Sequence, residues 1–225
     1  MKYPNLTEEK RLWKNGYRTV VGLDEAGRGA LAGPVVAAAT VIKNYKIKIE
    51  NLKSIKDSKK LSPRQRERAY ELITKDKGIQ WGIGVVSEKV IDRINVLEAT
   101  KLAMEKAVKN LVKKIRRRSS VRNFHDRVNF APVSFLILDG NFRLGLSLPQ
   151  KSIIRADEKV FSCAAASVLA KVTRDRIMIR YHQKYPRYRF DLHKGYGTKL
   201  HLQRLKKYGC SRIHRLSFAP VRDKA

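Results

Sequence analysis

An apolar run that is typical of a buried β-strand ends abruptly in two neighbouring acidic residues. Residues 19–24 form this run, and Asp24 and Glu25 are followed almost at once by a Gly27-Arg28-Gly29 turn. Adjacent carboxylates raise each other's pKa, so they persist side by side where a cation lies between them. Magnesium and manganese prefer hard oxygen ligands, glycine permits close backbone approach, and arginine suits phosphate. The segment therefore indicates metal and phosphate chemistry at the end of a strand.

Strand and helix signals follow one another along the rest of the chain. We expect strands over residues 19–24, 34–42, 79–86, 133–138 and 151–155, and helices over 62–75, 95–114, 158–182 and 198–209. The first two strands are joined by a glycine-containing turn and should pair antiparallel, whereas the continuous apolar run 133–138 should be buried on both faces. This order predicts an α/β domain with a central mixed sheet flanked by helices, followed by a small C-terminal extension.

The charge of the chain restricts its partners. The 225 residues contain 50 Lys and Arg against 20 Asp and Glu, a formal net charge of +30. This balance indicates a polyanionic partner, most simply nucleic acid. An anionic membrane surface is the competing interpretation, but no long basic amphipathic helix stands apart from the predicted fold. No secretory signal is visible, and Cys163 and Cys210 are too few for a disulfide framework, so we expect a cytoplasmic protein.

Three apolar segments end in acidic residues: Asp24 with Glu25, then Asp139, then Asp157. Ligands of open α/β sheets collect beyond the strand ends, where four carboxylates could hold two divalent ions. Successive side chains of a strand point to opposite faces, so Asp24 and Glu25 reach one site only if the strand stops there. Gly27 supplies that break. Asp139 could equally belong to an Asp-Gly turn and Asp157 could cap a helix, and spacing alone leaves these alternatives open.

Residues 21–29, followed by Gly33-Pro34-Val35, resemble the opening signature of ribonuclease HII, the type 2 ribonuclease H family. The resemblance continues in order through residues 57–62, 95–100, 138–141, 164–175, 194–198 and 214–221. It implies a ribonuclease H-like fold with a catalytic domain over residues 1–183 and a helical C-terminal extension over 184–225 that contributes to substrate binding. It also implies an endoribonuclease that hydrolyses the RNA strand of RNA–DNA hybrids and incises 5′ of ribonucleotides embedded in duplex DNA.

The resemblance assigns roles to particular residues. The catalytic, metal-binding carboxylates are Asp24, Glu25, Asp139 and Asp157, holding two magnesium or manganese ions. Backbone groups of Gly27, Arg28 and Gly29 would contact the 2′-hydroxyl that distinguishes RNA from DNA, and Tyr196 would pack against the neighbouring sugar. Without the family, Tyr196 would be read as a partly buried loop residue.

Basic residues should supply the remaining binding energy. We expect Lys59 and Lys60 to contact phosphates, with Ser58 assisting. From Arg174 to Arg215 there are 13 Lys or Arg, interleaved with tyrosines that either stack on substrate or pack in the protein. Residues 113–132 form a basic segment longer than is usual in the family, either a duplex-gripping element or a solvated loop.

Two competing functions remain at this point. The charge alone would suit a non-enzymatic RNA- or DNA-binding protein, and the carboxylates alone would suit another two-metal nuclease of the same fold. A metal-free ribonuclease needs a histidine pair, and the five histidines show no suggestive pairing in the sequence. Type 3 relatives have an extra N-terminal domain and Glu as the fourth acid, whereas Asp157 and the short N-terminal segment here match type 2. We expect a monomer.

Overall fold

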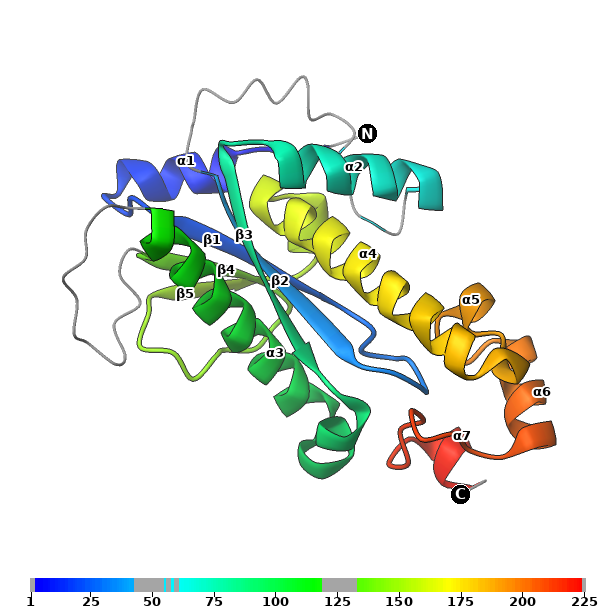
Figure 1. Cartoon of the computed structure of the whole chain (residues 1–225). Coiled ribbons are helices and arrows are strands. Elements are labelled where there is room, and N and C mark those ends of the chain that lie inside the picture. Colours follow the sequence, from blue (N-terminus) through cyan, green and yellow to red (C-terminus); the bar gives the residue numbers. More distant parts are fainter. Residues whose placement is uncertain (1–2, 43–54, 56–57, 59–60, 119–132, 224–225) are drawn as a thin grey trace.

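A five-stranded sheet with helices on both faces forms the centre of the computed structural model, which describes residues 3–42, 55, 58, 61–118 and 133–223 (Figure 1). The strands are β1 (Val20–Ala26), β2 (Val35–Ile42), β3 (Ile79–Val86), β4 (Phe135–Asp139) and β5 (Gln150–Ile153). The helices are α1 (Thr7–Lys14), α2 (Pro63–Lys75), α3 (Glu88–Arg118), α4 (Phe161–Lys184), α5 (Phe190–His193), α6 (Lys199–Tyr208) and α7 (Ala219–Arg222). Short 3₁₀ turns cover Ala156–Glu158 and Pro186–Tyr188.

The sheet is mixed, as predicted, with strand order β3-β2-β1-β4-β5. β1 pairs antiparallel with β2, and β2 pairs antiparallel with β3. β4 runs parallel to β1 with Leu138 opposite Leu23, and β5 runs parallel to β4. Because the carboxyl ends of parallel strands meet at one edge, this topology brings the residues after Leu23 and Leu138 together. The acidic residues at those positions are Asp24 and Asp139.

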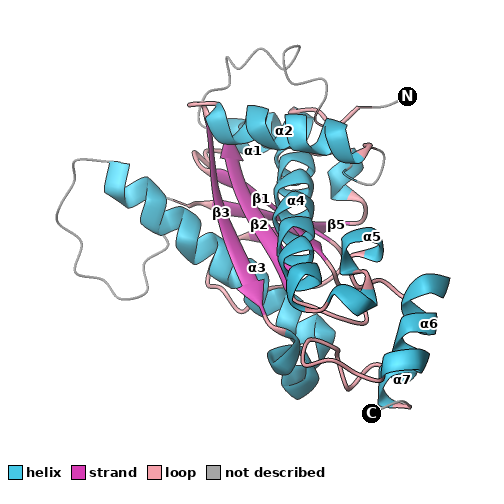
Figure 2. Ribbon diagram, turned by 45° about the vertical axis from the view of Figure 1, so that its right-hand side comes forward, coloured by secondary structure: helices cyan, strands magenta, loops and turns pink. Residues whose placement is uncertain are grey.

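The two faces of the sheet are covered by different helices (Figure 2). α3 packs over β2 and β3, where a Cβ on Gly84 would lie 1.9 Å from the carbonyl oxygen of Ala103. Glycine is required there because the helix backbone lies directly against the strand. α4 covers β1 and β2 from the other face, with fully buried alanines at 164–166. These small side chains let α4 lie close against the sheet.

Several predicted element boundaries are confirmed by their caps. Ser62 and Gln65 form the reciprocal capping box that starts α2, and Thr198 accepts a hydrogen bond from the His201 amide at the start of α6. α3 begins earlier than expected, at Glu88, and is interrupted at Asn95, whose φ is 65°. The side chain of Asn95, the residue at which this helix was predicted to begin, accepts hydrogen bonds from the amides of Leu97 and Glu98, so it acts as a cap inside a kinked helix.

Helices α5, α6 and α7 gather at one end of the molecule, beyond the turn that joins β1 to β2 (Figure 1). The core beneath α5 and α6 is aromatic: Tyr188 and Phe190 are buried and stack with ring centroids 5.4 Å apart, whereas α7 packs through Val221 against Leu31 and Leu205. Within the described residues, no helix is long and apolar enough to cross a membrane.

Candidate metal centre and adjoining glycine turn

Three carboxylates from separate parts of the chain meet at the edge of the sheet. Asp24 lies on β1, Asp139 ends β4, and Asp157 lies in the 3₁₀ turn before α4. One carboxylate oxygen from each lies within 4.8 Å of the other two. The amide of Ala156 donates to Asp139 Oδ1 at 2.9 Å, so this aspartate also fixes the turn that carries Asp157. The separate turn and cap interpretations of these acids are therefore insufficient, because the fold assembles them into one group.

The electrostatics of this group favour a cation. Asp24 and Asp157 are buried, with 5% and 3% of their surfaces exposed. Burial raises the pKa of Asp24 well above its ordinary value, and the charges of Glu25, Asp139 and Asp157 raise it further. A divalent cation would relieve this repulsion, and carboxylate oxygens are the ligands that magnesium and manganese prefer. The residues thus fit a divalent metal centre.

Glu25 lies outside the group of three, and the prediction that the strand stops at Asp24 and Glu25 was wrong. β1 continues to Ala26 because its pairing with β2 extends to Ala26 and Val36, beyond the point where pairing with β4 ends. Side chains therefore still alternate at Asp24 and Glu25. Glu25 Oε1 lies 3.7 Å from Arg28 Nη1, yet its charge is the second largest cause of the raised Asp24 pKa. Its charge therefore acts on Asp24 although its oxygens are not part of the group of three.

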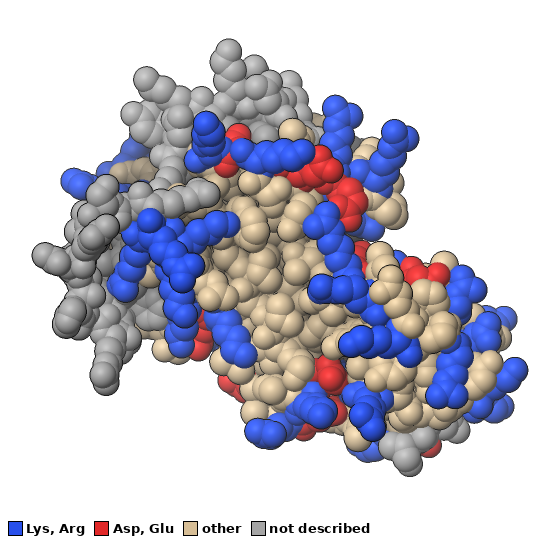
Figure 3. Space-filling view, viewed as in Figure 1, with Lys and Arg blue, Asp and Glu red and all other residues tan. Residues whose placement is uncertain are grey.

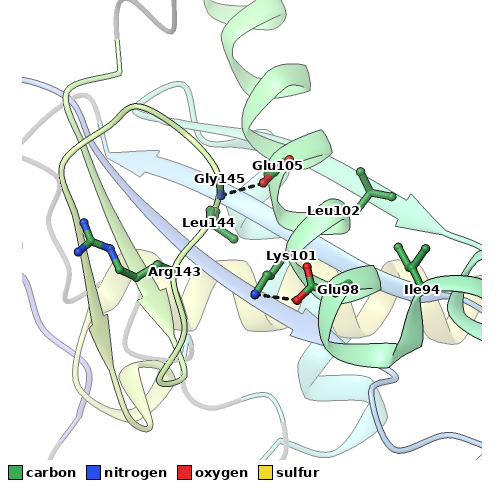
Figure 4. A pocket seen from close by; sticks show the side chains of 8 residues that line it. All are labelled: Ile94, Glu98, Lys101, Leu102, Glu105, Arg143, Leu144 and Gly145. Atoms are coloured by element: carbon green, nitrogen blue, oxygen red, sulfur yellow. Dashed lines mark hydrogen bonds and ion pairs between the residues drawn. The ribbon is translucent and has the colours of Figure 1, made fainter.

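The loop after Asp139 is held against α3 beside a hollow of about 650 Å³ (Figure 4). Glu105 Oε1 accepts a hydrogen bond from the Gly145 amide at 3.1 Å, and Lys101 pairs with Glu98 at 2.8 Å. Glu98, Lys101, Glu105 and the Gly145 amide on this wall are thus engaged in two pairs, and the Arg143 side chain is drawn apart from them (Figure 4). The hydrogen bond from Gly145 to Glu105 ties the loop that links β4 to β5 to α3.

The Gly27-Arg28-Gly29 turn lies beside Tyr196. Gly27 adopts a φ of +94°, which ends the strand three residues after Asp24. Ala30 forms an isolated antiparallel bridge with Tyr196, and the Leu31 amide donates to the Gly195 carbonyl at 2.8 Å. A Cβ on Gly29 would meet no atom within 4 Å, so this glycine faces open space. The structure therefore brings together the two parts of the predicted sugar contact.

Other predicted binding residues are placed differently. Ser58 is buried, with its Oγ 2.9 Å from Ser167 Oγ, and Ser167 in turn hydrogen-bonds to Asp24. Ser58 therefore lies behind the carboxylates. Lys59 and Lys60 lie outside the described residues, as do residues 119–132 of the basic segment.

Basic side chains gather over the C-terminal helices (Figure 3). The exposed members include Lys184, Arg187, Arg189, Lys199, Lys206 and Lys207. Tyr188 is 1% exposed and belongs to the aromatic core, so the packing interpretation is correct for it. Tyr208 is half-buried, with Arg187 Cζ 5.6 Å and Lys207 Nζ 5.4 Å from its ring centroid.

Sequence reasoning missed a buried histidine pair and two buried arginines. Nε2 of His201 lies 3.1 Å from Nε2 of His214, although 13 positions separate them in the chain. The pair is buried, so it has no access to a ribose hydroxyl. Arg174 and Arg215 are each fully buried. In a chain with so many Lys and Arg, the sequence around a basic residue does not show whether its side chain is buried or exposed. Only the fold could identify the buried arginines.

Comparison with known proteins agrees with this geometry. The family model described as Ribonuclease HII matches residues 21–221. A Ribonuclease HII of Chlamydia trachomatis serovar L2 is 45% identical over 223 residues, which cover 97% of this chain and 92% of that protein. The crystal structure of ribonuclease H2 from Pyrococcus horikoshii is 29% identical, with a TM-score of 0.63 and coverage of 91% and 96%. Bst-RNase HIII in complex with Mn²⁺ shares the fold at 19% identity, with a TM-score of 0.69 and coverage of 92% and 68%.

Proposed function

Because this chain belongs to the ribonuclease HII family, we propose that its carboxylate group and its glycine turn act together in hydrolysing RNA joined to DNA. The chain is a type 2 ribonuclease H, an endoribonuclease that acts on RNA–DNA hybrids. The finer proposal is that it also incises 5′ of single ribonucleotides in duplex DNA and leaves 3′-hydroxyl and 5′-phosphate ends. The observation that carries the proposal is the meeting of three aspartates next to a turn whose glycine faces open space.

Asp24, Asp139 and Asp157 would hold divalent cations, with Glu25 at the border of the site. Two magnesium or manganese ions bound there would lower the pKa of a water and stabilise the leaving 3′-oxygen. The protein's own contribution is to keep the carboxylates correctly spaced and oriented, while a bound cation would favour their ionised forms. Main-chain pairing of β1 with β4 sets the spacing of Asp24 and Asp139, and the Ala156 amide orients Asp139.

Selection of the substrate would come from the sugar and not from the bases. We infer that main-chain groups of the Gly27-Arg28-Gly29 turn contact the 2′-hydroxyl and that Tyr196 packs against the next sugar. A hydroxyl is a donor and an acceptor, so backbone groups can recognise it if no side chain blocks their approach. The open space at Gly29 satisfies that requirement.

Binding of the duplex would rest on the exposed basic residues of the C-terminal part. We propose that residues 1–183 form the catalytic domain and that the extension 184–225 supplies phosphate contacts, together with Lys59 and Lys60. Phosphate contacts position a duplex without reading its sequence. Affinity should therefore fall steeply with salt, by about 0.9 in log K per unit of log salt for each phosphate neutralised.

The decisive experiment offers the protein a DNA duplex that contains one ribonucleotide, an RNA–DNA hybrid and an all-DNA duplex. Each is incubated with Mg²⁺, Mn²⁺ or a chelator. We expect metal-dependent incision of the first two substrates. Asp139→Asn should reduce incision by more than about 100-fold, since even partners of metal ligands often contribute that much. Glu71→Gln removes one exposed carboxylate from α2 and is the matched control, with incision unchanged.

The competing functions predict other results. A non-enzymatic binding protein would bind the substrates without metal-dependent incision and would be indifferent to Asp139→Asn. A general two-metal nuclease would cut the all-DNA duplex as fast as the ribonucleotide-containing one. Absence of incision with either metal would exclude the proposed activity.

A further inference from the structure

Two fully buried arginines hold main chain instead of acidic side chains. Arg174 on α4 and Arg215 before α7 are each 0% exposed. Their six guanidinium hydrogen bonds all go to main-chain carbonyl oxygens, and none goes to a carboxylate in the part of the chain that the structure describes. Burying a charge without an ionic partner is unfavourable, and burial lowers the pKa of Arg215 to about 9. The hydrogen bonds that each buried arginine donates to the main chain are therefore the feature that its presence has to be explained by.

Arg215 holds the turn that follows the metal-binding strand. Its Nη2 donates to the Gly27 carbonyl at 2.7 Å and its Nη1 to the Arg28 carbonyl at 2.9 Å. Its Nε donates to Gly33 at 2.9 Å. A planar guanidinium offers donors in a fixed fork, which here reaches the carbonyls of Gly27, Arg28 and Gly33 at once. The shape of the Gly27-Arg28-Gly29 turn thus depends on one side chain that is 188 positions away in the sequence.

His214 holds the main chain at Tyr196 through a series of hydrogen bonds that all run in one direction. The Ser211 amide donates to His214 Nδ1 at 2.8 Å, so the proton of the neutral ring must be on Nε2. This Nε2 donates to His201 Nε2 at 3.1 Å, and His201 Nδ1 then donates to the Tyr196 carbonyl at 3.0 Å. The relay fixes the tautomer of each ring and the position of the Tyr196 main chain.

The two neighbours are held beside residues 30–33 and reach different loops. His214, which follows a turn, forms an isolated antiparallel bridge with Ala32, and the Arg215 amide donates to the Leu31 carbonyl at 2.9 Å. From these positions the Arg215 side chain reaches the glycine turn, and the His214 side chain reaches the Tyr196 loop through His201. Residues 30–33 lie between these partners, bridged to Tyr196 on one side and to His214 on the other.

We propose that His214 and Arg215 are positioning residues that hold the Gly27-Arg28-Gly29 turn and Tyr196 at a fixed separation, and so determine the preference of the enzyme for a 2′-hydroxyl. This inference rests on the proposed role of the turn and Tyr196. Both side chains are buried, at 2% and 0% exposure, and therefore act through the main chain that they hold and not by touching substrate. C-terminal residues would then control a contact made by residues near the N-terminus.

The test compares duplexes that carry a ribonucleotide or a 2′-fluoro nucleotide at the same position, because fluorine cannot donate a hydrogen bond. The quantity measured is the ratio of kcat/KM for the two substrates, alongside thermal unfolding of each variant. Arg215→Lys keeps the charge but loses the fork, and His214→Phe keeps a ring but loses the relay. We expect each to reduce the ratio by about tenfold, the effect of losing roughly one hydrogen bond in the transition state.

A matched control is Arg68→Lys, the same substitution on an exposed side chain of α2, outside the proposed duplex-binding extension, which should leave the ratio unchanged. A structural role alone would lower activity on both substrates in proportion to the folded fraction and keep the ratio. That result would overturn the inference, and so would failure of both Arg215→Lys and His214→Phe to fold.

Gly29→Ala separates this inference from the proposed function. If Gly29→Ala preserves the ratio, the turn does not read the 2′-hydroxyl, and the proposed recognition is wrong. If Gly29→Ala abolishes the preference while Arg215→Lys and His214→Phe keep it, recognition by the turn stands and only the positioning role falls.

Discussion

Alanine substitution at Gly27 and Gly29 should have opposite consequences, although the two positions lie in one turn. Gly27 has a φ of +94°, and a Cβ there would lie 1.9 Å from Arg174 Nε, 2.4 Å from Cδ and 2.8 Å from Cζ. Arg174 cannot withdraw easily, because its guanidinium donates to the carbonyls of Ala32, Pro34 and Lys194. The substitution therefore combines backbone strain with overpacking.

The size of the effect follows from these two causes. A left-handed conformation costs an alanine roughly 1–2 kcal/mol, and overpacking of a buried site typically costs roughly 1–3 kcal/mol. Gly27→Ala should thus reduce the free energy of unfolding by about 2–5 kcal/mol. For a chain of this size the expected fall in Tm is roughly 4–20 °C.

Gly29→Ala is the internal control for stability. A Cβ at Gly29 meets nothing within 4 Å, so the change in unfolding free energy should stay within about 0.5 kcal/mol. The new methyl group would instead occupy the space in which we propose the ribose to bind. Incision at a ribonucleotide should therefore fall by at least about tenfold in a protein of normal stability, the effect of losing about one hydrogen bond.

Urea denaturation and single-turnover incision of a ribonucleotide-containing duplex measure the two effects separately. If Gly27→Ala unfolds within 1 kcal/mol of the wild-type protein, Arg174 yields more readily than its three hydrogen bonds imply, and the reasoning about the turn is refuted. If Gly29→Ala retains full incision, the sugar does not bind against this glycine.

Three further measurements test other parts of the structure. Burial lowers the pKa of His201 and of His214 from 6.5 to about 4. The free energy of unfolding should therefore be highest above pH 6.5 and fall by up to about 3 kcal/mol per ring as the pH drops toward 4. Urea midpoints that do not change with pH would contradict this. Mn²⁺ at 100 times its dissociation constant should stabilise the wild-type protein by about 2.7 kcal/mol but not Asp139→Asn, and an equal shift of Tm in both would place the ion elsewhere. Burial raises the pKa of Glu9, so its charged form opposes folding increasingly as pH rises through that pKa. Glu9→Gln should accordingly raise Tm more at pH 8 than at pH 4, and an equal change at both would show that the carboxyl is not buried as described.

Local signals in the sequence predicted much of the secondary structure. The capping box at Ser62 and Gln65 defines the start of α2 because the residues that satisfy the free amides are within one turn of the helix. The kink at Asn95 illustrates the limit. Its capping side chain was recognisable, but the extra helical turns before it, from Glu88, were missed. The local sequence pattern did not show that the residues before Asn95 are also helical.

The carboxylate site was predictable in its members but not in its geometry. Asp24, Asp139 and Asp157 each follow an apolar segment, and the fold brings these three together. The absence of Glu25 from this group was not predicted, because β1 continues on its β2 side after its pairing with β4 has ended. How far a strand continues on each side depends on its neighbours, which lie elsewhere in the chain.

The sequence by itself determined the residues that carry the chemistry: acids at strand ends, glycines in the adjoining turn, and an excess of positive charge for a polyanionic substrate. These features depend on the type of each residue and on its neighbours in the chain, so they can be recognised from the sequence alone. Only the tertiary structure decided which basic residues are buried and what holds the turn beside Tyr196. Arg215 reaches Gly27 and His214 reaches the Tyr196 loop across more than one element of the fold. Such contacts exist only once the C-terminal segment has packed against the β1–β2 turn, because their energy comes from partners that are remote in sequence and adjacent in space.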